Sequence, residues 1–96
     1  MNTALHTPLA LHLPLSFSVA APDTLDTLEA VLAIARRGGL RLAAMRLSPQ
    51  AGSDEVFMDL QAAEADLLAL FLARLRNHAC VAGIVVHRDG RAWTPP

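Results

Sequence analysis

The sequence predicts an α+β fold in which a four-stranded antiparallel sheet carries two helices on one face. Between Leu13 and His87 the apolar residues alternate between a period of two and a helical period, in the order strand, helix, strand, strand, helix, strand. Pro22 and the pair Gly38-Gly39 mark the breaks that separate the first three segments. Two β-α-β units with right-handed crossovers close most simply into one such sheet, which is the ferredoxin-like arrangement.

The first unit starts with a strand in which Leu13, Leu15, Phe17 and Val19 share one face. Pro22 ends this strand, and Asp23, Thr24 and Asp26 offer side-chain oxygens that cap a helix. The helix carries Arg36 and Arg37 at its end and stops at Gly38-Gly39, because glycine adopts the left-handed backbone conformation that closes a helix.

The second unit starts with a hairpin of two strands, 40–47 and 55–61, joined by the polar turn 48–54. A helix is expected over 63–77, with Leu67, Leu68, Phe71 and Leu75 as its apolar stripe. The last strand is expected over 80–87, with Cys80, Ala82, Ile84 and Val86 on one face and Val81 and Val85 on the other. Asp89-Gly90 is a tight-turn signal, which leaves 91–93 either as a short fifth strand or as a tail.

The domain is expected to span residues 13–88, between an extended N-terminal tail (1–12) and a C-terminal turn and tail (89–96) that contains Trp93. A formal net charge of −1 argues against nucleic acid or an anionic membrane as partner. The single cysteine, Cys80, rules out an internal disulfide and favours a reducing, cytoplasmic setting. Charges and prolines interrupt every apolar run before it reaches the length of a membrane span.

Catalytic and metal motifs are weak. His78, Cys80 and His87 lie close in sequence, but the spacings that build tetrahedral metal sites are missing, so a helix-end histidine and a buried structural thiol are expected instead. The serines lack a nucleophile elbow, and Gly38-Gly39 lacks the spacing of a phosphate loop. Three phenylalanines and no tyrosine do not supply the aromatic platform on which a sheet of this kind binds RNA. We therefore expect no catalytic residue and no metal.

The helix-free face of the sheet and one of its edges are candidate partner surfaces. Phe57 and Val85 are expected on the uncovered face, with Met45 adding apolar surface beside the edge. The strand 40–47 is expected to be that edge, with Arg41, Ala43 and Met45 as its candidate pairing residues. Two chains are expected to pair there, edge to edge, as a homodimer.

Two short motifs carry a family resemblance. They are Thr27-Leu28-Glu29-x-Val31-Leu32 and the sequence Arg37-Gly38-Gly39-Leu40, which leads into Leu42-Ala43-Ala44-Met45-Arg46-Leu47. With the element order, these residues resemble an ACT domain, and more narrowly the short regulatory subunit of acetolactate synthase (acetohydroxyacid synthase) of the isozyme II type. The resemblance covers about residues 15–86.

This resemblance implies a non-enzymatic subunit that binds and activates the large catalytic subunit in branched-chain amino-acid biosynthesis. Thiamine diphosphate, flavin and magnesium would belong to that large subunit, with no cofactor on this chain. Effector-binding relatives place an Asn-x-x-Gly-x-Leu pattern in the loop before the first helix, and Asp23, Asp26 and Leu28 stand at those positions here, beside Thr24. Only the leucine matches, and two carboxylates repel the carboxylate of an amino acid, so valine sensing is expected to be weak or absent.

Two alternatives remain open at this stage. In the first, the chain is a stand-alone sensor that binds an amino acid at a dimer interface through groups such as Asp23 and Arg41 of a neighbouring chain. In the second, which is weaker, it is an acylphosphatase-like hydrolase of the same fold, although the loop after the first strand has no arginine to hold a phosphate. For Asp23 and Asp26 there is also a purely structural explanation, in which they cap the helix and bind no ligand.

Overall fold

A computed structural model describes residues 11–87 of the chain. Its elements follow the order that the apolar spacing predicts, with one short 3₁₀ turn added before the first helix. They are β1 (Leu11–Ala20), η2 (Ala21–Asp23), α1 (Thr24–Arg37), β2 (Arg41–Gln50), β3 (Ser53–Ala62), α2 (Ala65–Arg76) and β4 (Ala82–Val86).

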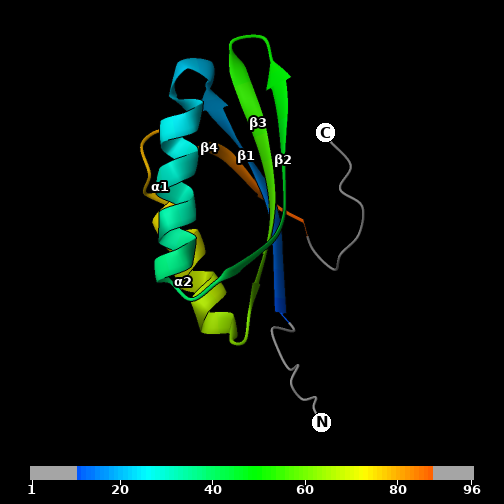
Figure 1. Cartoon of the computed structure of the whole chain (residues 1–96), viewed down its shortest axis with the longest axis vertical. Coiled ribbons are helices and arrows are strands. Elements are labelled where there is room, and N and C mark those ends of the chain that lie inside the picture. The colour runs from blue at the N-terminus through cyan, green and yellow to red at the C-terminus, as the bar shows by residue number, and fades with distance from the viewer. Residues whose placement is uncertain (1–10, 88–96) are drawn as a thin grey trace.

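The four strands form one antiparallel sheet in the order β2-β3-β1-β4. Both helices lie on the same face of this sheet (Figure 1). The α+β, ferredoxin-like prediction is therefore confirmed, and β2 lies at an edge as expected. The other face of the sheet carries no helix.

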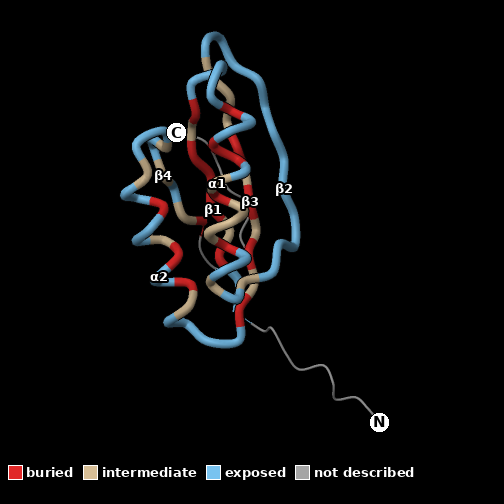
Figure 2. Tube along the Cα trace, turned by 60° about the vertical axis from the view of Figure 1, so that its left-hand side comes forward, coloured by how far each residue is buried: buried red, intermediate tan, exposed pale blue. Residues whose placement is uncertain are grey.

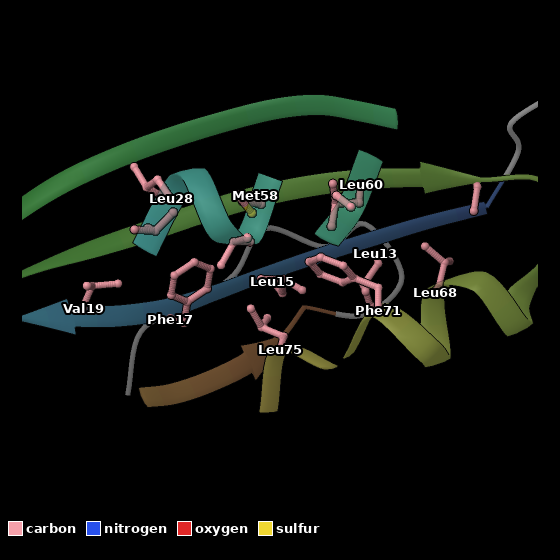
Figure 3. Close-up of a cluster of buried hydrophobic side chains, with 14 residues drawn as sticks. Leu13, Leu15, Phe17, Val19, Leu28, Met58, Leu60, Leu68, Phe71 and Leu75 are labelled. Atoms are coloured by element: carbon pink, nitrogen blue, oxygen red, sulfur yellow. The ribbon is translucent and has the colours of Figure 1, made fainter. Parts of the chain in front are cut away.

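The core lies between the two central strands and the helices. On β1 and β3 every second side chain is buried, as the period of two predicts, and residues such as Phe17 and Met58 are fully enclosed (Figure 3). Val31 of α1 and Leu75 of α2 close this layer from the helical side. Figure 2 shows that the buried residues concentrate on β1, β3 and the inner sides of the helices. Burial of these aliphatic side chains, at about 25 cal/mol per Å² of apolar surface, is the main contribution to stability.

Strand β2 is exposed along all ten of its residues. Its register against β3 shifts between Leu42 and Ala44, which leaves Ala43 as the extra residue of a β-bulge. Cross-strand partners point to the same side of a sheet, so the pairs Leu42–Leu60 and Met45–Met58 place both β2 side chains on the helical side. Leu47, opposite the buried Val56, joins them. Met45 was expected beside the helix-free face, and the bulge explains the difference.

The limits of β1 and β4 differ from the sequence-based ones. β1 starts at Leu11, and β4 covers only Ala82–Val86 because hydrogen bonds from the His78 amide to the Leu75 carbonyl and from the Val81 amide to the His78 carbonyl hold a turn before it. Cys80 falls in this turn and is exposed, so the expected buried thiol is wrong. The expected faces of β4 are correct for Val86, which pairs with the buried Leu15, and for Val85, which pairs with Ser16 on the opposite face. They are wrong for Ala82, which pairs with Ser18 on the helix-free side after a register shift, and for Val81, which packs against the core.

Pro14 lies well inside β1 and has no amide hydrogen. If its nitrogen faced a paired strand, one hydrogen bond of the sheet would be missing. Its carbonyl accepts a 2.7 Å hydrogen bond from the His87 amide, on the β4 side. In an antiparallel strand the amide and carbonyl of one residue point to the same neighbour, so the missing donor removes no bond to β3. The proline is tolerated because β1 extends past the end of β4 at this point.

The predicted turn at Asp89-Gly90, the segment 91–93 with Trp93, and most of the N-terminal tail lie outside the described residues. Within residues 11–87, no helix has the length and apolar character needed to cross a bilayer.

Candidate functional site

The described surface contains a cleft of about 420 Å³ at the start of α1, where the helix lies beside the end of β2 and the start of β3. Its walls come from three segments that are far apart in the sequence. The lining residues are Ala21, Pro22, Thr24, Leu25, Asp26, Leu47 and Asp54.

Local backbone geometry places the cleft at this corner. The Ala21 amide donates a 3.2 Å hydrogen bond to the Gly52 carbonyl in the β2–β3 hairpin, which ties the exit of β1 to that turn. Pro22 then fixes the backbone of η2, and α1 follows directly at Thr24. The segment expected to be an effector loop is therefore one tight 3₁₀ turn rather than an open loop.

The polar groups of the cleft are acidic or neutral. The Thr24 hydroxyl donates a 2.7 Å hydrogen bond to Oδ2 of Asp54, and Asp26, two residues further along α1, is an exposed lining residue. No lysine or arginine is among the lining residues in the described part of the chain. Such a site attracts a cation or an ammonium group and disfavours a carboxylate.

The predicted effector residues divide into three groups. Thr24 and Asp26 line the cleft, as an effector site would require. Asp23 is exposed at the N-cap position of α1, but its side chain makes no capping hydrogen bond. The prediction that its carboxylate caps the helix is therefore wrong. Leu28 is buried in the core and does not line the cleft.

Leu47 and Asp54 were not predicted as site residues. Both come from the β2–β3 hairpin and reach the cleft only because the Ala21–Gly52 hydrogen bond brings that hairpin to the start of α1. Asp54 directly follows the turn, where an aspartate is common for local reasons, so its spacing carried no signal of a site.

The candidate pairing residues of the edge occupy different positions on β2. Arg41 pairs with Gln61 on the helix-free side, Ala43 is the bulge residue, and Met45 lies on the helical side. The structure thus assigns no common face to the three residues. Leu42, Met45 and Leu47 instead form a partly exposed apolar row on the helical side, which we name the β2 row.

The helix-free face carries three side chains in contact, one from β2, one from β3 and one from the residue that follows β4. The Arg46 guanidinium lies 5.3 Å from the Phe57 ring centroid, and the Phe57 and His87 rings stack with centroids 5.7 Å apart. Burial lowers the pKa of His87 from its ordinary value of 6.5, while the charge of Glu55 acts in the opposite direction. The Ser16 side chain is also buried on this face.

A second polar contact on the helix-free face joins His12 to Asp59. Nδ1 of His12 lies 3.1 Å from Oδ2 of Asp59, and both side chains are partly exposed to solvent. Ion pairs of this exposure contribute little to stability, so this contact is a surface feature and not a candidate site.

The possible metal ligands are not gathered into a site within residues 11–87, where no group of three or more candidate ligands occurs. Nδ1 of His78 accepts a 3.2 Å hydrogen bond from the backbone amide of Cys80, so this ring nitrogen orders the turn before β4.

No protein-family model matches the sequence, and no curated protein matches it. Solved structures do match its backbone. The ACT domain from the GTP pyrophosphokinase of Chlorobium tepidum superposes with a TM-score of 0.64 at 10% identity, over 80% of this chain and 97% of that domain. The C-terminal domain of the MgtC protein from Mycobacterium tuberculosis gives a TM-score of 0.69 at 10% identity, over 93% of this chain and all (100%) of that one.

A designed protein, Ferredog-Diesel, also shares the backbone, with a TM-score of 0.54 at 9% identity over 92% of this chain and 94% of the design. At such identities the likeness shows a common fold and leaves function to the residues of the site. ACT domains are among the proteins that share this fold.

Proposed function

We propose that this chain is a non-catalytic regulatory subunit of acetolactate synthase, which activates the large catalytic subunit in branched-chain amino-acid biosynthesis in the cytoplasm. The observation that carries the proposal is the exposed apolar edge strand β2, which lies beside the cleft at the start of α1. Partly exposed apolar residues on an unpaired edge are typical of a chain that works by docking.

The two motifs of the family resemblance support this assignment through their structural roles. Leu28 and Val31 of the first motif form the core face of α1. Gly39, in the second, has a φ of 80° and turns the chain out of the helix into β2. The motifs thus shape the helix and edge strand that the proposal uses.

In this proposal two copies pair through their β2 edges into one continuous sheet. The unpaired backbone groups of β2 supply the hydrogen bonds, and the β2 row supplies apolar contact on the helical side. The thiamine diphosphate, flavin and magnesium of the reaction are assigned to the large subunit.

Valine regulation is proposed to be weak or absent. The cleft stands where an effector would bind, but Asp26 and Asp54 present carboxylates to it. Each would repel the carboxylate of valine. Among the described lining residues there is no lysine or arginine that could bind this carboxylate instead. Isothermal titration of valine into the protein should therefore give no saturable heat.

The direct test is acetolactate formation by the cognate large subunit, titrated with this protein in the presence and absence of valine. Saturable activation that valine leaves unchanged is expected. No activation at any ratio would overturn the proposal, and activation that valine reverses would overturn only the part that concerns the cleft.

A stand-alone amino-acid sensor is the second candidate function. The observation that favours it is the same acidic cleft, because Asp26 and Asp54 would suit the ammonium group of an amino acid. A ligand that binds only the folded state raises the melting temperature, so a thermal-shift series over the common amino acids separates the two candidates. A concentration-dependent shift without any effect on the large subunit would favour the sensor.

A further inference from the structure

One side of α1 faces the edge strand and is only partly covered, since three of its four residues are exposed while Leu32 packs against the core. Leu25, Glu29, Leu32 and Arg36 recur at intervals of four, three and four residues, so they lie along one side of the helix. Leu25 lines the cleft together with Leu47 of β2, which shows that this side faces the edge. Leu25 is 78% exposed, the largest value among the apolar side chains that are described as exposed.

The charges along this helix are separated by sign. Asp26 lies exposed in the first turn, close to the cleft, while Arg36 and Arg37 lie exposed in the last turn. Within residues 11–87 the structure records one ion pair, His12 with Asp59, so neither Asp26 nor Arg36 forms a salt bridge inside the described chain. The acidic cleft and the basic helix end are therefore both available to a second molecule.

Pairing of two β2 edges brings these opposite charges together. The strands of two copies related by a two-fold axis run antiparallel, and because α1 is fixed to its own sheet, the two α1 helices also run antiparallel beside the axis. The acidic start of each helix then lies next to the basic end of the other. This step rests on the homodimer in the proposed function.

We propose that Arg36 of a second copy of this chain enters the acidic cleft and pairs with Asp26, close to Asp54, so that each copy completes the site of the other. A guanidinium suits this place because it bonds carboxylates with several N–H groups. Its aliphatic stem also covers the exposed Leu25. The cleft is thus filled by the protein itself in the dimer, and a small cationic ligand would have to compete with Arg36.

Charge reversal tests the pairing, with sedimentation equilibrium of the full chain at low salt as the measurement. Each dimer contains two symmetric pairs, so Arg36→Glu and Asp26→Lys should each raise the dimer dissociation constant about tenfold. The double variant Asp26→Lys/Arg36→Glu exchanges the charges and should return close to the wild-type value. Added salt should weaken the wild-type dimer by screening.

Arg74→Glu is the matched control. It makes the same charge change in the last turn of a helix, with a similar effect on the helix dipole, but on α2, which lies on the β4 side of the sheet and away from β2 (Figure 2). It should change dissociation by less than about threefold. Circular dichroism of each variant confirms folding, which is expected because all of these side chains are exposed.

The outcomes separate this inference from the proposed function. Equal effects of Arg36→Glu and Arg74→Glu on dimer dissociation, or failure of the charge exchange to restore association, would overturn the inference and leave the edge-paired dimer intact. A wild-type protein that stays monomeric at every concentration would overturn the dimer and the inference together, while activation of the large subunit would still be measured separately.

Discussion

The Thr24 hydroxyl donates a hydrogen bond of 2.7 Å to a carboxylate oxygen of Asp54, thirty residues later in the chain. The bond joins the first residue of α1 to the second residue of β3 at the base of the cleft. Thr24 is buried and Asp54 half-buried, so solvent does not fully compete for this bond. It therefore fixes the position of the helix start relative to the hairpin.

Loss of this hydroxyl should destabilise the protein. Thr24→Val keeps the shape of the side chain but removes the donor, and we expect the free energy of unfolding to fall by about 1 kcal/mol. Urea denaturation measures the change. Thr24→Ser retains the hydroxyl and is the control, so an equal loss in both variants would show that packing of the methyl group, and not the hydrogen bond, is responsible.

His87 should make stability depend on pH. Because burial lowers its pKa in the folded state, the unfolded chain binds the proton more tightly, and protonation favours unfolding. The stabilising contribution of neutral His87 is complete above its unfolded value of 6.5 and is lost as the pH falls below it towards the folded pKa. His87→Phe keeps a ring against Phe57, so its stability relative to the wild type should rise between about pH 8 and about pH 5. Parallel denaturation curves across this range would contradict the assignment.

The buried hydroxyl of Ser16 should be a net cost to the fold. Its side chain is 1% exposed, and Oγ has no hydrogen-bond partner among the described residues. Ser16→Ala removes this unsatisfied group and should raise the free energy of unfolding by about 1 kcal/mol. Ser18→Ala, on the same face but only half-buried, should change it by less than about 0.5 kcal/mol. A loss of stability in Ser16→Ala would mean that the hydroxyl is satisfied.

The two edges of the sheet should respond differently to charge. Met45 on β2 is 41% exposed and Val85 on β4 is 38% exposed. Replacement by lysine should therefore remove a similar amount of apolar contact within the monomer at either position. Met45→Lys should weaken self-association by about tenfold or more, whereas Val85→Lys should leave it unchanged. Light scattering coupled to size exclusion measures both. The reverse ranking would place the dimer contact on β4.

The fold was predictable because its central strands carry one clear pattern. Leu13, Leu15, Phe17 and Val19 are all buried on one face of β1, and β3 repeats this pattern. β2 was harder, since the bulge at Ala43 changes the period within the strand and places Met45 on the side opposite to simple alternation. No residue type marks such a bulge in advance.

The site was only partly predictable. Thr24 and Asp26 could be found because they follow a strand and begin a helix, a local signal that the sequence shows directly. Leu47 and Asp54 depend on a backbone hydrogen bond between Ala21 and Gly52, which no local spacing encodes. The burial of His87 and its stacking on Phe57 likewise follow from sheet register and not from neighbours in the sequence.

The bulge at Ala43 also limits which strands the open edge accepts. A straight, uninterrupted edge would offer the same template at every position, so strands could add in many frames and growth could continue as fibrils. The irregular residue interrupts that template at one fixed point near the beginning of β2, and only frames that leave Ala43 unmatched preserve good backbone geometry. The edge thereby favours a closed pair of two chains in one frame over open-ended aggregation.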